Sequence, residues 1–216
     1  MPSVAGSTSS RTAARERAAG SRPRVGVLSL QGDFALHSAA LAELGCEPIR
    51  VSLPEHLQSL AALVLPGGES STMLRLLDST GLRLPLERYV RDQPVLGTCA
   101  GLILLADDAD KLPRPTFAVL DVTAARNGWG RQVHSFTGPV DVPVLGAELS
   151  GVFIRAPRIT RVGRGVQVIA SYAGEPVGVR QGNVAALTFH PELTNDRRLH
   201  AWFLREVAGL PVGAPR

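Results

Sequence analysis

Residues 94–106 read PVLGTCAGLILLA, a short apolar run that passes through a turn of small residues directly into a helical pattern. Gly97 and Gly101 stand two positions before and two positions after Cys99. Small residues at those positions permit a sharp strand–turn–helix bend, which raises the central side chain to the C-terminal edge of a sheet. The segment therefore predicts an α/β fold and places Cys99 at the edge of its sheet.

Apolar runs of strand length alternate with helical patterns throughout the N-terminal half of the chain. The expected strands are residues 25–30, 48–53, 62–65 and 94–96, and the expected helices are a segment capped by Asp33 and residues 55–60, 70–77, 86–91 and 101–106. Strands and helices that alternate at this spacing indicate a mostly parallel sheet with helices on both faces.

The C-terminal half contains consecutive strand-like runs joined by short turns, which predict antiparallel hairpins. These runs are residues 117–123, 130–136, 151–154, 166–172, 176–180 and 184–189. Residues 194–207 close the chain as an amphipathic helix. We therefore expect one three-layer, flavodoxin-like α/β domain, whose mixed, mostly parallel sheet carries antiparallel hairpins in its C-terminal half.

The composition of the 216-residue chain is that of one folded domain in a reducing compartment. Hydrophobic residues make up 44% and charged residues 19%, so the chain has enough apolar surface for a packed core. The longest apolar stretch, residues 95–106, is shorter than the roughly 20 residues of a membrane-spanning helix. Cys46 and Cys99 alone provide no disulfide framework, so we expect a cytoplasmic protein without membrane attachment.

The net charge of +4 comes from the N-terminal segment, because residues 1–24 contain five arginines and one glutamate. A nucleic-acid-binding protein concentrates positive charge on its folded surface, so we expect no nucleic-acid partner. Residues 1–23 have almost no large apolar side chain and are predicted to be a disordered leader, with a transit peptide as the alternative. The folded domain is expected at residues 24–210 and a tail at 211–216.

Cys99 and the segment His190-Pro191-Glu192 form a candidate catalytic triad. Alternate residues of an extended chain face the same way, so Glu192 can orient the imidazole of His190 while His190 takes the proton of the Cys99 thiol. The other thiol and imidazole groups have no such context and are expected to be structural or surface groups; they are Cys46, His37, His56, His134 and His200. No Cys or His spacing fits a zinc site, so no metal is expected.

Residues 65–72 read LPGGESST and form a glycine turn between a strand and a helix. The N–H groups of such a turn can bind an anion or hold an oxyanion. The turn has neither the Gly-x-Gly-x-x-Gly pattern of dinucleotide-binding proteins nor the lysine of a P-loop, so a nucleotide cofactor is not indicated.

Taken together, these motifs resemble those of the class I, triad-type glutamine amidotransferases, and most closely those of the glutaminase subunits of pyridoxal 5′-phosphate synthases. The shared motifs are LQG at residues 30–32, PGGES at 66–70, GTCAG at 97–101 and HPE at 190–192. RNGWGRQ at residues 126–132 and FIRAP at 153–157 distinguish this glutaminase family from its relatives. The resemblance extends from about residue 24 to about residue 210, and its departures from the family pattern are His134 and Thr137.

The resemblance implies roles for individual residues. Cys99, His190 and Glu192 match the catalytic triad. The positions that match the family's glutamine-binding residues are Gly68, Glu69, Ser70, Arg126, Ile154 and Arg155. The backbone N–H groups of Gly68 and Ala100 are expected to form the oxyanion hole.

The resemblance also implies the reaction, which is hydrolysis of L-glutamine to L-glutamate and ammonia without a cofactor. In the family, the ammonia passes to a separate barrel-shaped synthase subunit within a large hetero-oligomer, and this subunit combines it with ribose 5-phosphate and glyceraldehyde 3-phosphate. The sequence contains no (β/α)₈ pattern of its own, so the synthase is expected to be a partner protein.

Two alternatives remain open at this point. The first is a glutaminase that serves another pathway, such as histidine biosynthesis, and residues 126–132 and 153–157 argue against it. The second is a flavodoxin-like module that binds a ligand or a partner without catalysis, and the complete set of Cys99, His190 and Glu192 argues against it.

Overall fold

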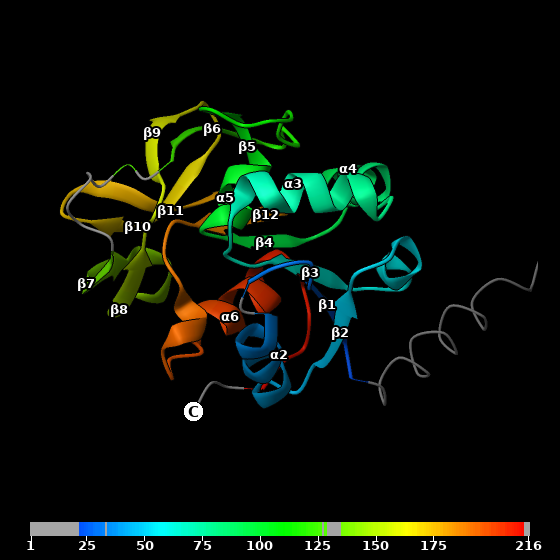
Figure 1. The fold of residues 1–216 in the computed structure, drawn as a ribbon. Helices are drawn as coiled ribbons and strands as arrows, with labels where there is room; N and C mark the ends of the chain where they lie inside the picture. The colour runs from blue at the N-terminus through cyan, green and yellow to red at the C-terminus, as the bar shows by residue number, and fades with distance from the viewer. Residues whose placement is uncertain (1–21, 33, 127, 129–134, 214–216) are drawn as a thin grey trace, which may run out of the picture.

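The computed structural model describes residues 22–32, 34–126, 128 and 135–213. Within these residues, a nine-stranded sheet runs through the molecule in the order β2-β1-β3-β4-β12-β11-β10-β7-β8 (Figure 1). The first five strands of this order are parallel to one another. They are β1 (Arg24–Leu28), β2 (Glu47–Val51), β3 (Ala62–Leu65), β4 (Val95–Thr98) and β12 (Val184–Leu187).

The remaining four strands of the sheet pair in antiparallel fashion, which confirms the predicted C-terminal hairpins. They are β7 (Ser135–Val142), β8 (Ala147–Ile154), β10 (Gln167–Tyr172) and β11 (Glu175–Gln181). The turn between β10 and β11 has positive φ at both Ala173 and Gly174, as a tight two-residue hairpin requires.

Helices cover both faces of the parallel strands (Figure 1). One face carries α3 (Ser70–Ser79), α4 (Arg83–Asp92) and α5 (Ala100–Leu105), and the other carries α2 (Phe34–Glu43) and α6 (Arg198–Trp202). The strand β3 shows why both faces are closed. Leu63 and Leu65 belong to the core beneath α3, α4 and α5, whereas Val64 belongs to the core beneath α2 and α6. The predicted three-layer α/β arrangement is thereby confirmed.

A second, three-stranded sheet was not expected from the sequence. It consists of β5 (Ala106–Ala109), β6 (Leu120–Ala125) and β9 (Arg158–Val162). The strand β5 begins where α5 ends, and its Asp107-Asp108 pair interrupts the apolar pattern that would predict a strand. The strand predicted to begin at residue 117 begins only at Leu120.

The C-terminal helix is shorter than the predicted span 194–207. Thr194 accepts a hydrogen bond from the Asp196 N–H, and the Asp196 carboxylate accepts one from the Arg198 N–H, so a side-chain-capped turn precedes α6. After α6 the chain continues as a single π-helical segment, Phe203–Val207. The short 3₁₀ helices are Pro54–Leu57, Pro143–Leu145 and Pro191–Leu193.

Several predicted features lie outside the described residues, namely residues 1–21 of the leader, Asp33, His134 and most of the strand predicted at 130–136. At the other end, Val212 packs against the core beneath α2 and α6, and the Gly213 N–H donates to the carbonyl of Leu44. No helix in the described part of the chain is long and apolar enough to cross a membrane.

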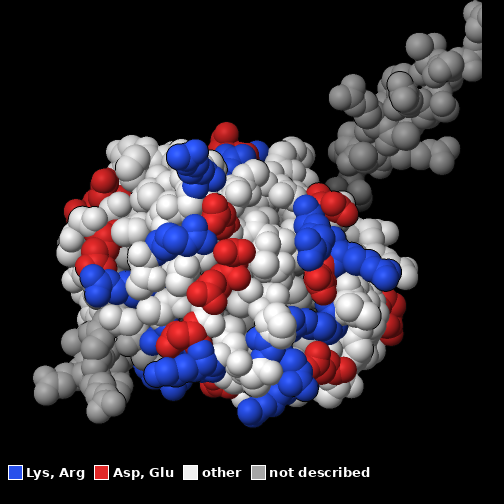
Figure 2. Space-filling view, turned by 90° about the horizontal axis from the view of Figure 1, so that it is seen from above, with Lys and Arg blue, Asp and Glu red and all other residues white. Residues whose placement is uncertain are grey.

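Charged side chains of both signs are mixed on the surface seen from above (Figure 2). Basic side chains, nearly all of them arginines, lie beside aspartates and glutamates over this face, and no broad area of one sign stands out. This face therefore lacks the continuous basic surface that a phosphate backbone requires.

Candidate active site

Cys99 occupies the bend between β4 and α5, with φ +48° and ψ −102°. A positive φ at a residue other than glycine is strained and persists only where the surrounding structure enforces it. Here close packing enforces it, because a Cβ atom on Gly101 would lie 2.0 Å from the carbonyl oxygen of Leu65. The sharp bend predicted from the two flanking glycines is therefore present, and Cys99 lies at its apex.

His190 and Glu192 follow β12 and are both buried. The imidazole Nδ1 lies 2.7 Å from Glu192 Oε1, so the carboxylate accepts a hydrogen bond and leaves Nε2 as the ring atom available to Cys99. The ring also packs against the glycine turn, because a Cβ atom on Gly67 would lie 2.3 Å from His190 Cε1. Contacts on two sides thus fix the orientation of the imidazole.

The charges of the triad support one another. Burial by itself lowers the pKa of His190, but the interactions with Cys99 and Glu192 outweigh burial and raise that pKa above its ordinary value. Burial by itself raises the pKa of Glu192, but the interactions with His190 and His37 hold it below its usual range. The imidazolium is therefore the favoured form of His190, and a cation beside a cysteine favours the thiolate, which is the nucleophilic form of that residue.

Two small hollows adjoin Cys99. The first has a volume of about 110 Å³ and is lined by Gly68, Glu69, Ser70, Cys99, Ile103, Arg126, Ile154 and Arg155. The second has a volume of about 140 Å³ and is lined by Gly32, Gly67, Gly68, Cys99, Ile154, Arg155 and His190. All six residues predicted to bind glutamine therefore line the same hollow as the predicted nucleophile.

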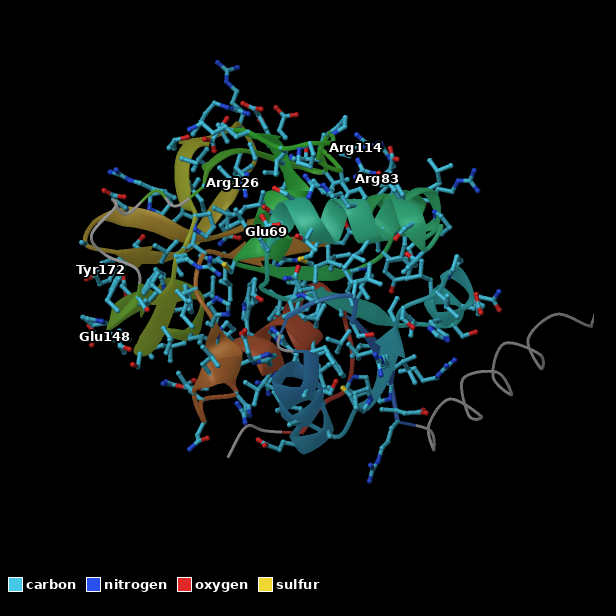
Figure 3. The ribbon with its side chains drawn as sticks, viewed as in Figure 1. Glu69, Arg83, Arg114, Arg126, Glu148 and Tyr172 are labelled. Atoms are coloured by element: carbon cyan, nitrogen blue, oxygen red, sulfur yellow. The ribbon has the colours of Figure 1, made fainter. Side chains whose placement is uncertain are left out.

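Glu69 and Arg126 lie together at the start of α3 (Figure 3). Glu69 caps this helix by accepting hydrogen bonds from the N–H groups of Ser71 and Thr72, and Arg126 Nη2 lies 3.0 Å from Glu69 Oε1. Burial raises the pKa of Glu69, but the hydrogen bonds from Thr72 and Ser71 outweigh it and lower the pKa to about 2. An anionic and a cationic group thus stand side by side at one end of the hollow.

The two predicted oxyanion-hole residues also border Cys99. Ala100 is the first residue of α5, so its N–H has no carbonyl acceptor within that helix. Gly68 lies in the turn after β3 and lines both hollows. Gly68 and Ala100 thus follow two neighbouring strands of the sheet, β3 and β4.

Sequence reasoning missed the contribution of His37 and His200. Both were expected to be structural or surface residues, and both are fully buried; the contact that the sequence did not reveal is that of His37 Nε2, which lies 3.2 Å from Glu192 Oε2. The available signal was the placement of His37 on the apolar face of α2, four residues before Leu41. A histidine on a buried face needs polar partners, but the sequence does not reveal which ones.

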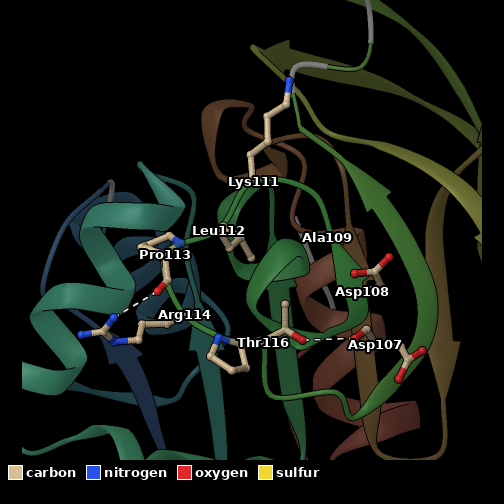
Figure 4. Close-up of a pocket in the computed structure, with 9 residues that line it drawn as sticks. Asp107, Asp108, Ala109, Lys111, Leu112, Pro113, Arg114 and Thr116 are labelled. Carbon is tan, nitrogen blue, oxygen red and sulfur yellow. Dashed lines mark hydrogen bonds between the residues drawn. The ribbon is translucent and has the colours of Figure 1, made fainter.

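A larger hollow of about 450 Å³ lies in the segment that joins β5 to β6 (Figure 4). It is lined by Asp107, Asp108, Ala109 and residues 111–116, none of which was predicted to act in catalysis or binding. This segment does contact the site from outside, because the Lys111 carbonyl accepts a hydrogen bond from Arg126 Nη1 and Asp110 accepts one from the Arg126 N–H.

Comparisons with known proteins agree with this geometry. A protein named pyridoxal 5′-phosphate synthase subunit PdxT from Thermotoga neapolitana is 47% identical over 186 residues, which cover 85% of this chain and 99% of the relative. A protein of the same name from Salinispora arenicola is 48% identical over 190 residues, which cover 84% of this chain and 94% of the relative.

Solved structures show the same relationship. One described as a glutamine amidotransferase superposes with a TM-score of 0.81 at 47% identity, covering 86% of this chain and 99% of the other. The structure of PurLQS from Thermotoga maritima, at 17% identity and a TM-score of 0.64, shares the fold. The model of the SNO glutamine amidotransferase family matches residues 27–209. The resemblance inferred from the sequence motifs is thus confirmed, and the chain belongs to the SNO glutamine amidotransferase family.

Proposed function

We propose that this chain hydrolyses L-glutamine to L-glutamate and ammonia, with Cys99 as the nucleophile, His190 as the proton carrier and Glu192 as the group that orients His190. The observation that carries the proposal is the hollow beside Cys99, which all six predicted glutamine-binding residues line. The hydrogen bond between His190 and Glu192 adds the base and the orienting group that a cysteine nucleophile requires.

The reaction proceeds in two halves. The Cys99 thiolate attacks the side-chain amide carbon of glutamine, and the N–H groups of Gly68 and Ala100 stabilise the resulting oxyanion. His190 donates a proton to the departing ammonia, which leaves a glutamyl thioester on Cys99. His190 then removes a proton from water, and the hydroxide attacks the thioester, which releases glutamate and restores the Cys99 thiolate beside the His190 imidazolium.

The charges at the end of the hollow suit the amino-acid part of the substrate. The carboxylate of Glu69 binds the α-ammonium group of glutamine, and the guanidinium groups of Arg126 and Arg155 bind its α-carboxylate. Ser70 and Ile154 complete the walls around the side chain. Arg155 has a positive φ of 43°, a strained conformation of the kind that concentrates at binding sites.

The ammonia passes to a separate barrel-shaped synthase subunit that makes pyridoxal 5′-phosphate, in a large hetero-oligomer in the cytoplasm. The names of the curated relatives, each a subunit of pyridoxal 5′-phosphate synthase, support this assignment. Residues 24–210 form the glutaminase domain, residues 1–23 a leader and residues 211–216 a tail.

Measured release of ammonia from glutamine tests the proposal, with the chain alone and with the synthase subunit. Cys99→Ala should lower turnover by more than about 1,000-fold, because catalysis without the nucleophile depends on binding groups alone. Cys46→Ala is the matched control, since Cys46 is the other buried thiol, and it should retain activity. Equal turnover of wild type and Cys99→Ala would overturn the assignment.

A further inference from the structure

A cluster of buried polar side chains lies behind the triad. It consists of His37 on α2, Thr98 at the end of β4 and His200 on α6, and all three are fully buried. His37 Nδ1 lies 3.1 Å from His200 Nε2, and His37 Nε2 lies 3.2 Å from Thr98 Oγ1. The same Nε2 lies 3.2 Å from Glu192 Oε2, so this rear cluster joins the catalytic carboxylate on the side opposite His190.

The contacts of the cluster fix where its protons lie. Burial lowers the pKa of His200 to about 3, so its imidazole is neutral at ordinary pH. His200 Nδ1 has no hydrogen-bond partner within the described residues, and a proton there would leave a buried N–H unpaired. The proton therefore lies on His200 Nε2, which donates to His37 Nδ1. His37 in turn carries its proton on Nε2, the atom that faces Thr98 and Glu192.

Glu192 depends on this N–H. Its Oε1 accepts the hydrogen bond from His190, whereas its Oε2 is buried and accepts no hydrogen bond of standard geometry within the described residues. The ring N–H of His37 is aligned with Thr98 Oγ1 and lies at ion-pair distance from Oε2, so its interaction with Oε2 is mainly electrostatic. Without His37, a carboxylate oxygen would be buried with no positive dipole facing it, which is costly.

We propose that His37 is a positioning residue of the active site: its Nε2–H holds the outer oxygen of Glu192, and Glu192 thereby keeps the His190 imidazolium paired with the Cys99 thiolate. This role rests on the proposed triad and goes beyond it, because it adds a fourth side chain from a different layer of the fold. His200 contributes by holding His37 in the tautomer whose N–H faces Glu192 Oε2.

The charged groups around the cluster do not replace His37. Arg197 and Asp196 act on His200, and they do so in opposite directions. Arg197 is itself paired with Glu43, and Asp196 is paired with Arg198. On the other side, Glu192 faces His190, whose partner is Cys99. His37 is therefore the group from α2 that supports the carboxylate.

The pH dependence of Cys99 alkylation tests the role of His37. The reagent is iodoacetamide, and mass spectrometry of the peptides separates Cys99 from Cys46. Without His37, Glu192 is held less firmly and stabilises the His190 imidazolium less, so a smaller fraction of Cys99 is thiolate at neutral pH. His37→Leu should therefore move the midpoint of Cys99 alkylation to higher pH by about one unit, the size expected for one lost interaction with a charged group.

Two amide variants distinguish an effect of the His37 Nε2–H group from an effect of packing. The side-chain nitrogen of His37→Gln reaches the place of Nε2 and should restore the wild-type midpoint, whereas that of His37→Asn reaches only the place of Nδ1 and should not. This pair also decides the question if His37→Leu fails to fold. Leu41→Ala is the matched control, because it removes core packing from the same helix and should lower the melting temperature without moving the midpoint.

Equal midpoints for wild type, His37→Gln and His37→Asn would overturn the proposal and leave His37 as a core residue. Equal shifts in the two amide variants would overturn it as well, because the position of the donor would then be irrelevant. Ammonia release by the wild type with its synthase is measured in parallel. Alkylation needs no glutamine. If the His37 variants show the expected midpoint shifts but the wild type releases no ammonia from glutamine, the proposed function is refuted and the role of His37 stands.

Discussion

At the scale of single residues, the site depends on close contacts that leave no room for a side chain. Cys99 keeps its strained positive φ because α5 is pressed against the end of β3 at Gly101. The His190 ring lies equally close to Gly67. The bend at Cys99 was predictable from the two glycines that flank it, and the contact between His190 and Glu192 was predictable from their spacing in the sequence.

The rear cluster was not predictable at this scale. His37 and Glu192 are 155 positions apart in the sequence, and their contact depends on how α2 packs against β1, β2 and the turn Pro191–Leu193. A single histidine on an apolar helix face indicates burial but not its partner. Long-range pairs of this kind are set by tertiary packing, which local patterns do not encode.

Gly101→Ala should destabilise the protein and reduce the reactivity of Cys99. The added Cβ would lie 2.0 Å from a backbone oxygen, so α5 or β3 must shift. Overpacking of this kind costs about 1–3 kcal/mol or more, which thermal unfolding and the rate of Cys99 alkylation would both report. Gly213→Ala is the control, because its Cβ would approach only to 4.0 Å of another atom. A variant that matches wild type in both measurements would show that the bend does not require glycine.

At the scale of elements, the hollow proposed to bind glutamine receives its two paired charges from the start of a helix and the end of a strand. Glu69 caps α3, and Arg126 follows β6 and is held by the segment after β5. The sequence predicted Glu69 and Arg126 as neighbours of the substrate only through the family resemblance. It missed β5, because a strand containing two aspartates has no apolar alternation to reveal it.

Arg126→Ala should raise the KM for glutamine about 10- to 100-fold and change kcat less, because loss of a charge-assisted contact to the substrate carboxylate weakens binding. Steady-state kinetics of ammonia release with the synthase present would measure this. Arg114→Ala is the control, since Arg114 pairs with Asp78 at the surface, does not line the hollow beside Cys99 and should leave KM unchanged. An unchanged KM in the Arg126 variant would remove this residue from the binding site.

At the scale of the whole molecule, parallel topology brings the chemistry together. The glycine turn follows β3, Cys99 follows β4 and His190 follows shortly after β12, and these three strands are neighbours in the sheet. The carboxyl ends of parallel strands meet at one edge, which is where α/β proteins bind ligands. The alternating pattern therefore predicted both the layers and the shared edge, whereas the second sheet and the π-helical turn depended on contacts far apart in sequence.

Covalent labelling with a glutamine analogue that carries an electrophilic ketone tests the central claim, that Cys99 attacks the side-chain carbon of bound glutamine. The wild-type complex should take up one equivalent of label on Cys99 and none on Cys46, and an excess of glutamine should slow the labelling. Label on Cys46, or labelling of Cys99 that glutamine does not slow, would contradict the account, because the reactive thiol would then not belong to a glutamine site.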